Sequence, residues 1–243
     1  MPRFGYSVRH KAAPTGNQAE ASFGVLMKTA VLFLALCATL AGVVAADRGT
    51  SIEGPRLLFR EDWKETPPAT LITQDHVANP DLILICRGPA EAKLRKSHHD
   101  KPADDPYYVW SGEADATWAL SLRQRTQLMD LSGPAKVRWR AKQSGFRQLR
   151  VIVRLADGRW LVSDQSDDAS DDWRLREFDL GQIRWRTLDI EKVVEGKWEP
   201  NPDLRRVEEI GCTDLMPGGR TQASSRLDWI EVHGRPIPRT NEP

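Results

Sequence analysis

The sequence has little cysteine and little net charge. Three of its 243 residues are cysteine, and the formal net charge is +1. The low cysteine count excludes a disulfide-rich scaffold. The balanced charge excludes the strongly basic surface expected of a protein that binds nucleic acid or an anionic membrane. The sequence also lacks an internal repeat, a low-complexity block and a convincing long helical pattern.

A long apolar run occurs near the start of the chain. Met27-Lys28 precede TAVLFLALCATLAGVVAA, which carries no charge and ends in small residues. This pattern predicts a secretory signal peptide cleaved after Ala46. A membrane anchor, which the length of the run would allow, is the alternative. Residues 1–26 show no such pattern, so we expect translation to start at Met27.

Residues 47–243 would form a secreted or periplasmic mature protein without a transmembrane segment. Removing residues 1–46 takes four basic and one acidic residue from totals of 35 and 34, which leaves 31 and 33. A length of about 200 residues suits one β domain, predicted over 47–234 and followed by a proline-containing tail, 235–243. The sequence leaves open whether Cys86 and Cys212 form a disulfide.

The strongest secondary-structure signal begins at Ala135. Apolar side chains alternate with Lys and Arg as far as Ala141, and the alternation resumes from Leu149 to Leu155. A period of two predicts strands with one apolar and one charged face. Asp157-Gly158 then predicts a hairpin that leads into a return strand.

Three later features predict which residues face the core. The acidic run at 163–172 is expected outside the core. The apolar parity changes between Leu175 and Phe178, which predicts a bulge near Arg176-Glu177. In the closing strand at 226–233, period two places Trp229 on the opposite face from Asp228.

The whole pattern favours an all-β, antiparallel sandwich or barrel, because about eight or nine short strand candidates follow one another. The apolar face of such a sheet must be covered, and a second sheet is the expected cover. The nine candidates are 57–63, 82–85, 118–122, 135–141, 149–155, 160–162, 173–180, 183–190 and 226–233, and 204–212 is a further strand or a helical turn.

Three short motifs carry a family resemblance over residues 130–234. They are DLSG at 130–133, DDW at 171–173 before FDL, and LDWIEV at 227–232 after the segment 203–210. With them the chain resembles the galactose-binding-like β-sandwiches, the jelly rolls of many carbohydrate-binding modules. The resemblance implies a secreted, non-catalytic protein that binds carbohydrate or polysaccharide. It also implies a structural calcium between the first and last strands, held by Asp228 with Glu61 or Asp62; an arginine salt bridge is the alternative.

A shorter motif supports an enzyme hypothesis. FREDWK at 59–64 is similar to the opening strand of a secreted β-sandwich group that acts on 3-keto disaccharides. A glycoside hydrolase or lyase would then use His98, His99 and Asp100, which lie in a polar loop. The same loop residues would alternatively contact a sugar or remain solvated. A structural envelope protein is the third hypothesis, and the sequence does not decide whether the protein is an enzyme.

The chain is rich in tryptophan, with nine residues, all after position 46. An indole is a flat apolar surface on which a sugar ring can stack. Trp139, Trp160 and Trp229 are expected in the core. The candidate ligand-binding residues lie beside loops or at the start of a strand, and packing is the alternative for each: Tyr108, Trp110, Trp173, Trp198, Arg147 and Gln148.

Overall fold

In the computed structural model, residues 54–69, 71–218 and 221–239 are described. The chain divides into two units, 1–49 and 50–243, and every described residue belongs to the second. The predictions for the signal peptide, its cleavage after Ala46 and the start at Met27 therefore lie outside the described residues. Within those residues, no helix is both long and apolar enough to cross a membrane.

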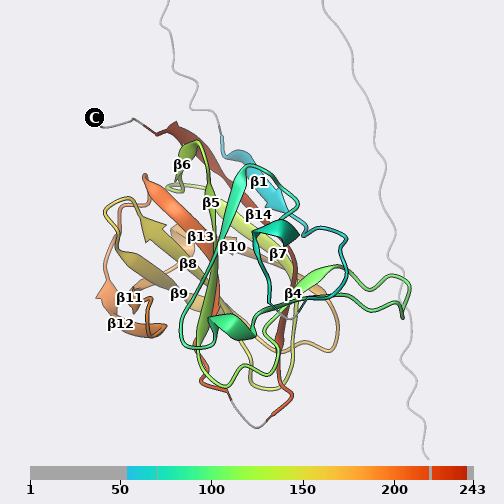
Figure 1. Ribbon diagram of the computed structural model, residues 1–243. Helices are drawn as coiled ribbons and strands as arrows, with labels where there is room; N and C mark the ends of the chain where they lie inside the picture. Colours follow the sequence, from blue (N-terminus) through green and yellow to red (C-terminus); the bar gives the residue numbers. More distant parts are fainter. Residues whose placement is uncertain (1–53, 70, 219–220, 240–243) are drawn as a thin grey trace, which may run out of the picture. The chain divides into compact units, whose positions relative to one another are not determined.

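The described part of the chain is built from antiparallel strands and three short 3₁₀ turns (Figure 1). The predicted all-β fold class is confirmed. In chain order the elements are β1 (Arg56–Glu61), η1 (Gln74–His76), β2 (Leu82–Arg87), η2 (Glu91–Lys93), β3 (Arg95–Ser97), β4 (Tyr108–Trp110), β5 (Trp118–Gln124), β6 (Gln127–Asp130), β7 (Lys136–Gln143), β8 (Leu149–Leu155), β9 (Trp160–Asp167), β10 (Arg174–Asp179), η3 (Leu180–Gln182), β11 (Trp185–Asp189), β12 (Val194–Glu199), β13 (Val207–Asp214) and β14 (Ser225–Pro238).

The strands form two layers that one long strand joins. In the first sheet β10, β7 and β14 lie side by side, β1 and β4 pair with the other edge of β14, and β3 pairs with β4. The second sheet has the order β12-β11-β9-β8-β13-β5-β2. Residues 235–238 of β14 pair with β6, which also pairs with β13. Strand β14 thus extends into the predicted tail.

The core lies between the two layers. Val137, Trp139 and Ala141 on β7 are fully buried, and the Lys and Arg residues between them are part-exposed, as the alternation predicted. Val151 and Val153 of the second sheet belong to the same apolar cluster. This arrangement confirms the predicted sandwich, because the apolar face of each sheet is covered by the other.

The acidic run at 163–172 lies outside the core as predicted, except for Ser163 and Asp167, which are buried. Strand β9 continues to Asp167, whose side chain is fully buried. The Trp139 indole N–H donates to Asp167 Oδ2 at 2.8 Å, and Arg174 Nε donates to Oδ1 at 2.8 Å. A buried carboxylate is tolerated here because both oxygens have charged or polar partners.

The predicted bulge in β10 is absent, and an unpredicted one occurs in β14. The pairing of β10 with β7 runs without a register shift. Leu175 is 61% exposed on the outer face, whereas Phe178 is buried. In β14 the register shifts between Leu227 and Trp229. The extra residue, Asp228, reverses the later parity, so Trp229 lies on the outer face rather than in the core.

The topology also settles the question of a disulfide. Cys86 on β2 and Cys212 on β13 both lie opposite Leu120 of β5, on its two sides. Two strand spacings separate them, roughly 9.6 Å, and a disulfide needs Cα atoms within about 7 Å. Both thiols are free. Burial raises the pKa of Cys86 to about 12 and that of Cys212 as well.

A second, smaller apolar cluster covers part of the outer face of the second sheet. Its buried members are Ala119, Ile152, Trp160, Val162, Leu188 and Val193. Trp160 is therefore buried as predicted, but outside the main core. Leu188 comes from β11, and Val193 comes from the turn between β11 and β12. This packing fixes the β11–β12 hairpin against the sheet.

Candidate functional site

The most exposed indole of the chain lies on the β11–β12 hairpin. Trp185 points into the core, so Arg184 and Arg186 beside it point outward. The register of the hairpin places Arg186 directly opposite Trp198. Trp198 is 43% exposed, as its sequence context predicted, although it lies in a strand rather than in a loop.

Two guanidinium groups hold this indole. The Cζ atom of Arg186 lies 4.0 Å from the ring centre of Trp198, and that of Arg184 lies 4.5 Å away. Cation–π contacts at these distances are attractive. Arg186 Nη1 also donates to the carbonyl of Gly196 at 2.9 Å. The ring therefore has a defined orientation on the surface.

A groove of about 570 Å³ begins at this indole. Its apolar floor consists of Leu131, Leu180, Ile183, Trp185 and Leu204, all buried. Its rim is polar and comprises Ser132, Arg184, Glu199, Asn201, Asp203 and Arg205. The volume falls within the range of small-molecule sites, about 300–1,000 Å³. An apolar floor with a polar rim suits a ligand that has both apolar faces and hydroxyl groups.

The far rim of the groove is a rigid turn. Pro200 and Pro202 flank Asn201, whose φ of 50° lies in the left-handed region that asparagine tolerates. Asp203 accepts hydrogen bonds from the backbone N and the side chain of Arg205. Those bonds lower the pKa of Asp203 to about 2. Asp203 thus remains ionised across the physiological pH range.

Two smaller hollows continue from the groove over the outer face of the second sheet. One, of about 330 Å³, shares Arg184 and Trp198 with the groove. The other, of about 270 Å³, shares Gln148, Arg150 and Glu195 with the first hollow. Gln148, predicted as a ligand contact, therefore lies in the same surface as Trp198.

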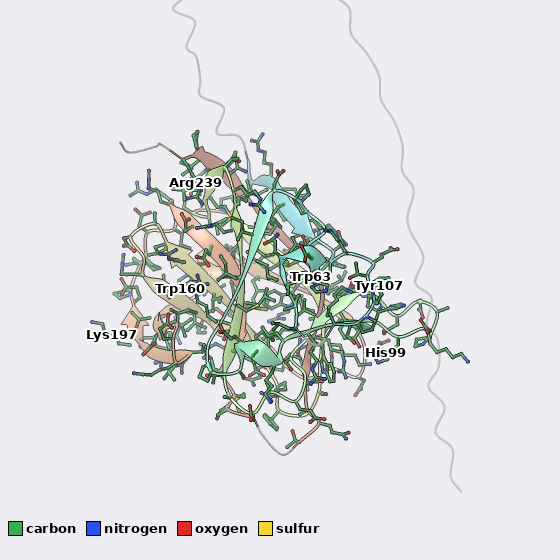
Figure 2. The ribbon with its side chains drawn as sticks, viewed as in Figure 1. Trp63, His99, Tyr107, Trp160, Lys197 and Arg239 are labelled. Carbon is green, nitrogen blue, oxygen red and sulfur yellow. The ribbon has the colours of Figure 1, made fainter. Side chains whose placement is uncertain are left out.

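The other predicted aromatic residues gather elsewhere. Tyr108 is buried, and its ring meets that of Trp173 edge-on at 5.2 Å. Trp110 lies near Arg95, with 5.4 Å from Cζ to the ring centre. In Figure 2, Tyr107 and Lys197 lie on opposite sides of the described domain. The residues predicted to form one ligand-binding site therefore lie on two separate surfaces.

Arg147 cannot contact a ligand directly, which corrects its assignment as a binding residue. Its side chain is completely buried and forms an ion pair with Asp214, at 3.2 Å. It also donates to the carbonyls of Ala114, Met216 and Ala223. Through these bonds, the planar guanidinium group of Arg147 links three segments of the chain.

In the predicted catalytic loop, His99 pairs with Asp105 and not with the expected Asp100. His99 Nδ1 lies 2.9 Å from Asp105 Oδ2 and 3.1 Å from the Tyr108 hydroxyl. The side chain of Asp100 is fully exposed, and its Oδ1 is 4.0 Å from His98 Nε2. The His98 ring stacks on Tyr107 instead, at 4.0 Å. The two histidines therefore have separate partners.

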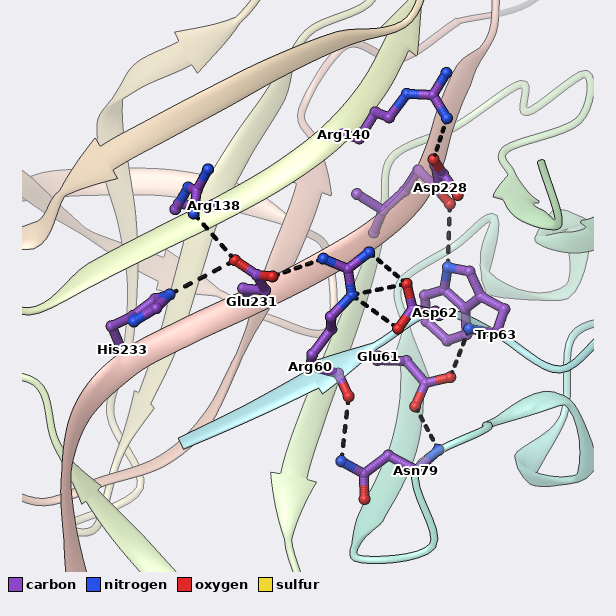
Figure 3. Close-up of polar contacts among 11 residues, drawn as sticks. Arg60, Glu61, Asp62, Trp63, Asn79, Arg138, Arg140, Asp228, Glu231 and His233 are labelled. Atoms are coloured by element: carbon purple, nitrogen blue, oxygen red, sulfur yellow. Dashed lines mark hydrogen bonds and ion pairs between the residues drawn. The ribbon is translucent and has the colours of Figure 1, made fainter. Parts of the chain in front are cut away.

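The carboxylates expected to hold calcium are already engaged (Figure 3). Asp62 pairs with Arg60 at 2.6 Å, and Asp228 pairs with Arg140 at 2.7 Å. Burial raises the pKa of Asp228, which the bond from Arg140 opposes. The salt-bridge alternative for Asp228 is therefore the observed one.

Glu61 is likewise engaged, by backbone donors. Its Oε1 accepts from the N–H groups of Trp63 and Ala78, at 2.8 and 2.7 Å, and its Oε2 accepts from Asn79 at 3.0 Å. Among the residues described, no group of three or more His, Cys, Asp or Glu side chains is placed to hold a metal ion. The donor set does not fit a calcium ion, because cations and N–H groups occupy the oxygens.

Sequence reasoning missed most of the groove. Arg184 and Arg186 alternate with Trp185 in a segment that was predicted to be a strand, but Trp198 was assigned to a loop. Recognising Val194–Glu199 as the pairing strand would have placed both arginines beside Trp198. Asn201, between two prolines, was a signal for a rigid turn. The floor residues come from distant segments, and period-two reasoning gives no information on such contacts.

Comparisons with known proteins yield structural neighbours only. No protein-family model matches the sequence, and no curated protein matches it. The chain is similar to a family 11 carbohydrate-binding module of a cellulosomal cellulase from Clostridium thermocellum, at 15% identity and a TM-score of 0.45, over 75% of this chain and 95% of that one. A family 11 module from the same organism, in complex with a β-1,3-1,4-mixed-linked tetrasaccharide, matches at 15% identity and a TM-score of 0.41, over 70% and 98%.

An exo-β-agarase is a further structural neighbour. It matches at 12% identity and a TM-score of 0.39, over 72% of this chain and 26% of the agarase. These neighbours include modules of the kind that the sequence resemblance indicated.

Proposed function

We propose that the β-sandwich binds carbohydrate in the groove beside Trp198, without catalysing a reaction there. The exposed indole, held by Arg184 and Arg186 at the mouth of an apolar-floored groove, is the observation that carries this proposal. A sugar ring presents C–H groups to an indole and hydroxyl groups to the rim. A pre-oriented ring also lowers the entropic cost of binding.

The predicted export signal agrees with a ligand outside the cytoplasm. Free polysaccharide and cell-wall glycans would then be the accessible partners. We retain a secreted or periplasmic location as part of the proposal.

Affinity electrophoresis of the full chain tests the proposal. Gels would contain neutral polysaccharides such as β-glucan, xylan, mannan and agarose. We expect retardation by at least one of them, lost in Trp198→Ala and kept in Trp173→Ala, because Trp173 belongs to the other surface. Absence of retardation by every polysaccharide, or equal retardation of Trp198→Ala, would contradict the proposal.

One observation supports hydrolase or lyase activity as a second candidate. The bond between Asp105 and His99 Nδ1 orients an exposed imidazole, as a general base requires. The test is a reducing-sugar assay on the same polysaccharides with wild type and His99→Ala. Product release that His99→Ala abolishes would support an enzyme, whereas no release by wild type would remove this candidate.

A further inference from the structure

We propose that the surface around Trp198 binds an internal stretch of a neutral, linear polysaccharide, rather than a single sugar, a chain end or an acidic glycan. This inference rests on the proposed function and names its ligand class. It has two independent supports, the continuity of the three hollows and the pairing of their charges.

The three hollows adjoin one another. Trp198 and Arg184 line both the groove and the hollow of about 330 Å³, so the indole stands between two sites for sugar rings. The Arg150–Glu195 ion pair, at 2.8 Å, similarly separates that hollow from the one of about 270 Å³. A polysaccharide that crosses both Trp198 and the Arg150–Glu195 ion pair would occupy all three hollows.

The surface is wide enough for several sugar units. The middle hollow alone is lined from β8 across β9 and β11 to β12. The middle hollow therefore spans three interstrand spacings of about 4.8 Å each, and its width is roughly 14 Å. The groove extends the surface toward Asn201, and the third hollow extends it toward Met216. Neither the groove nor the third hollow is an enclosed cavity, so the polymer need not terminate there.

The four arginines and four carboxylates that line this surface balance in formal charge, and Arg186 shares Glu195 with Arg150, at 3.8 Å. Arg184 bonds to Asp164 at 3.0 Å, and Arg205 bonds to Asp203 at 2.8 Å. The third pair is Arg150–Glu195. Glu199 is likewise bonded to Arg159, at 2.8 Å. At Arg150, Arg184 and Arg205 a uronate or sulfate would have to compete with a carboxylate that is already bonded there.

Neutral hydroxyl groups face no such competition. A guanidinium has five N–H donors and a carboxylate about four acceptor positions, so each paired group retains hydrogen-bonding capacity. Gln148 adds an amide that both donates and accepts at the junction of two hollows. The paired charges therefore suit neutral sugars.

Calorimetric titration of the full chain with oligosaccharides of two to six units tests this inference. The series would be derived from the neutral polysaccharide that retards the protein. We expect affinity to rise at least about tenfold from two to six units, because each occupied hollow adds contact. Gln148→Ala should weaken hexasaccharide binding several-fold and leave disaccharide binding unchanged. Gln127→Ala on β6 is the matched control and should change neither.

Charge selectivity is measured with polygalacturonate and heparin. We expect weaker retardation by both than by the neutral polymer, and a change in neutral-glycan affinity below about twofold between low and high salt. Disaccharide and hexasaccharide binding of equal strength, or stronger binding of the acidic polymers, would overturn this inference while leaving carbohydrate binding intact. Failure to bind any glycan would contradict both this inference and the proposed function.

Discussion

Trp198 on β12 and Arg186 on β11 form a cross-strand pair, with 4.0 Å between the guanidinium carbon and the indole centre. The pair holds the only strongly exposed indole among the described residues. Its consequence is that the binding surface is ordered before a ligand arrives. Arginine suits this role because its planar cation stacks on an aromatic face.

Arg186→Gln should therefore weaken glycan binding without unfolding the protein. Loss of the cation leaves the indole freer to rotate, so binding must additionally restrict it. We expect affinity to fall about three- to tenfold in calorimetry, with partial recovery in Arg186→Lys. The melting temperature should barely change. Wild-type affinity in Arg186→Gln would show that the stacked cation is irrelevant.

Asp167 should be essential for stability although it lies in an acidic run. Asp167→Ala would leave the buried Trp139 N–H unsatisfied and remove the partner of Arg174. We expect a loss of about 2–4 kcal/mol in the free energy of unfolding, measured by urea denaturation. The neighbouring Asp168→Ala, at an exposed position, should cost less than about 0.5 kcal/mol. Equal losses in the two variants would contradict this account of the core.

Lys96 should destabilise the fold at neutral pH. Its side chain is buried, and burial lowers its pKa from 10.5 to about 8. Below pH 8 both folded and unfolded chains carry the charge, so the full desolvation cost is present. Between pH 8 and 10.5 the folded state releases the proton first, and the cost decreases.

Lys96→Met should therefore be more stable than wild type at pH 7, by roughly 2 kcal/mol, since the removed charge cost its desolvation. The difference should shrink as the pH rises from 8 to 10. Urea denaturation at several pH values measures this, with exposed Lys93→Met as the control. A difference independent of pH would mean that the amine is not responsible.

Cys86 and Cys212 should both remain reduced in the folded protein. Alkylation of the unfolded chain without prior reduction, followed by peptide mapping, should modify both residues. A peptide linked through these two cysteines would contradict the arrangement of β2, β5 and β13. Reducing agent should leave the melting temperature unchanged.

Local patterns predicted the layers of the sandwich well. The alternation in β7 and β8 gave their buried faces correctly, because period two follows directly from strand geometry. The same reasoning failed in β14, where one extra residue at Asp228 moved Trp229 to the outer face. A bulge of this kind depends on pairing with neighbouring strands, which a single segment does not encode.

The candidate site was predictable only in part. Trp198 and Gln148 were identified from their positions near segment boundaries. Arg147 was misassigned because its partner, Asp214, is 67 residues away in the sequence. The floor of the groove depends on similar long-range packing. Residue type thus indicated the chemistry, while tertiary contacts decided which residues reach the surface.

The most direct test of the account follows the indole N–H signals of ¹⁵N-labelled full chain by NMR during titration with the neutral hexasaccharide. Substituting Trp198, Trp173 and Trp110 one at a time by Phe assigns the three relevant signals. Carbohydrate binding at the proposed groove predicts a saturable shift of the Trp198 signal, with those of Trp173 and Trp110 unmoved. A shift of the Trp173 or Trp110 signal, with Trp198 unaffected, would contradict it.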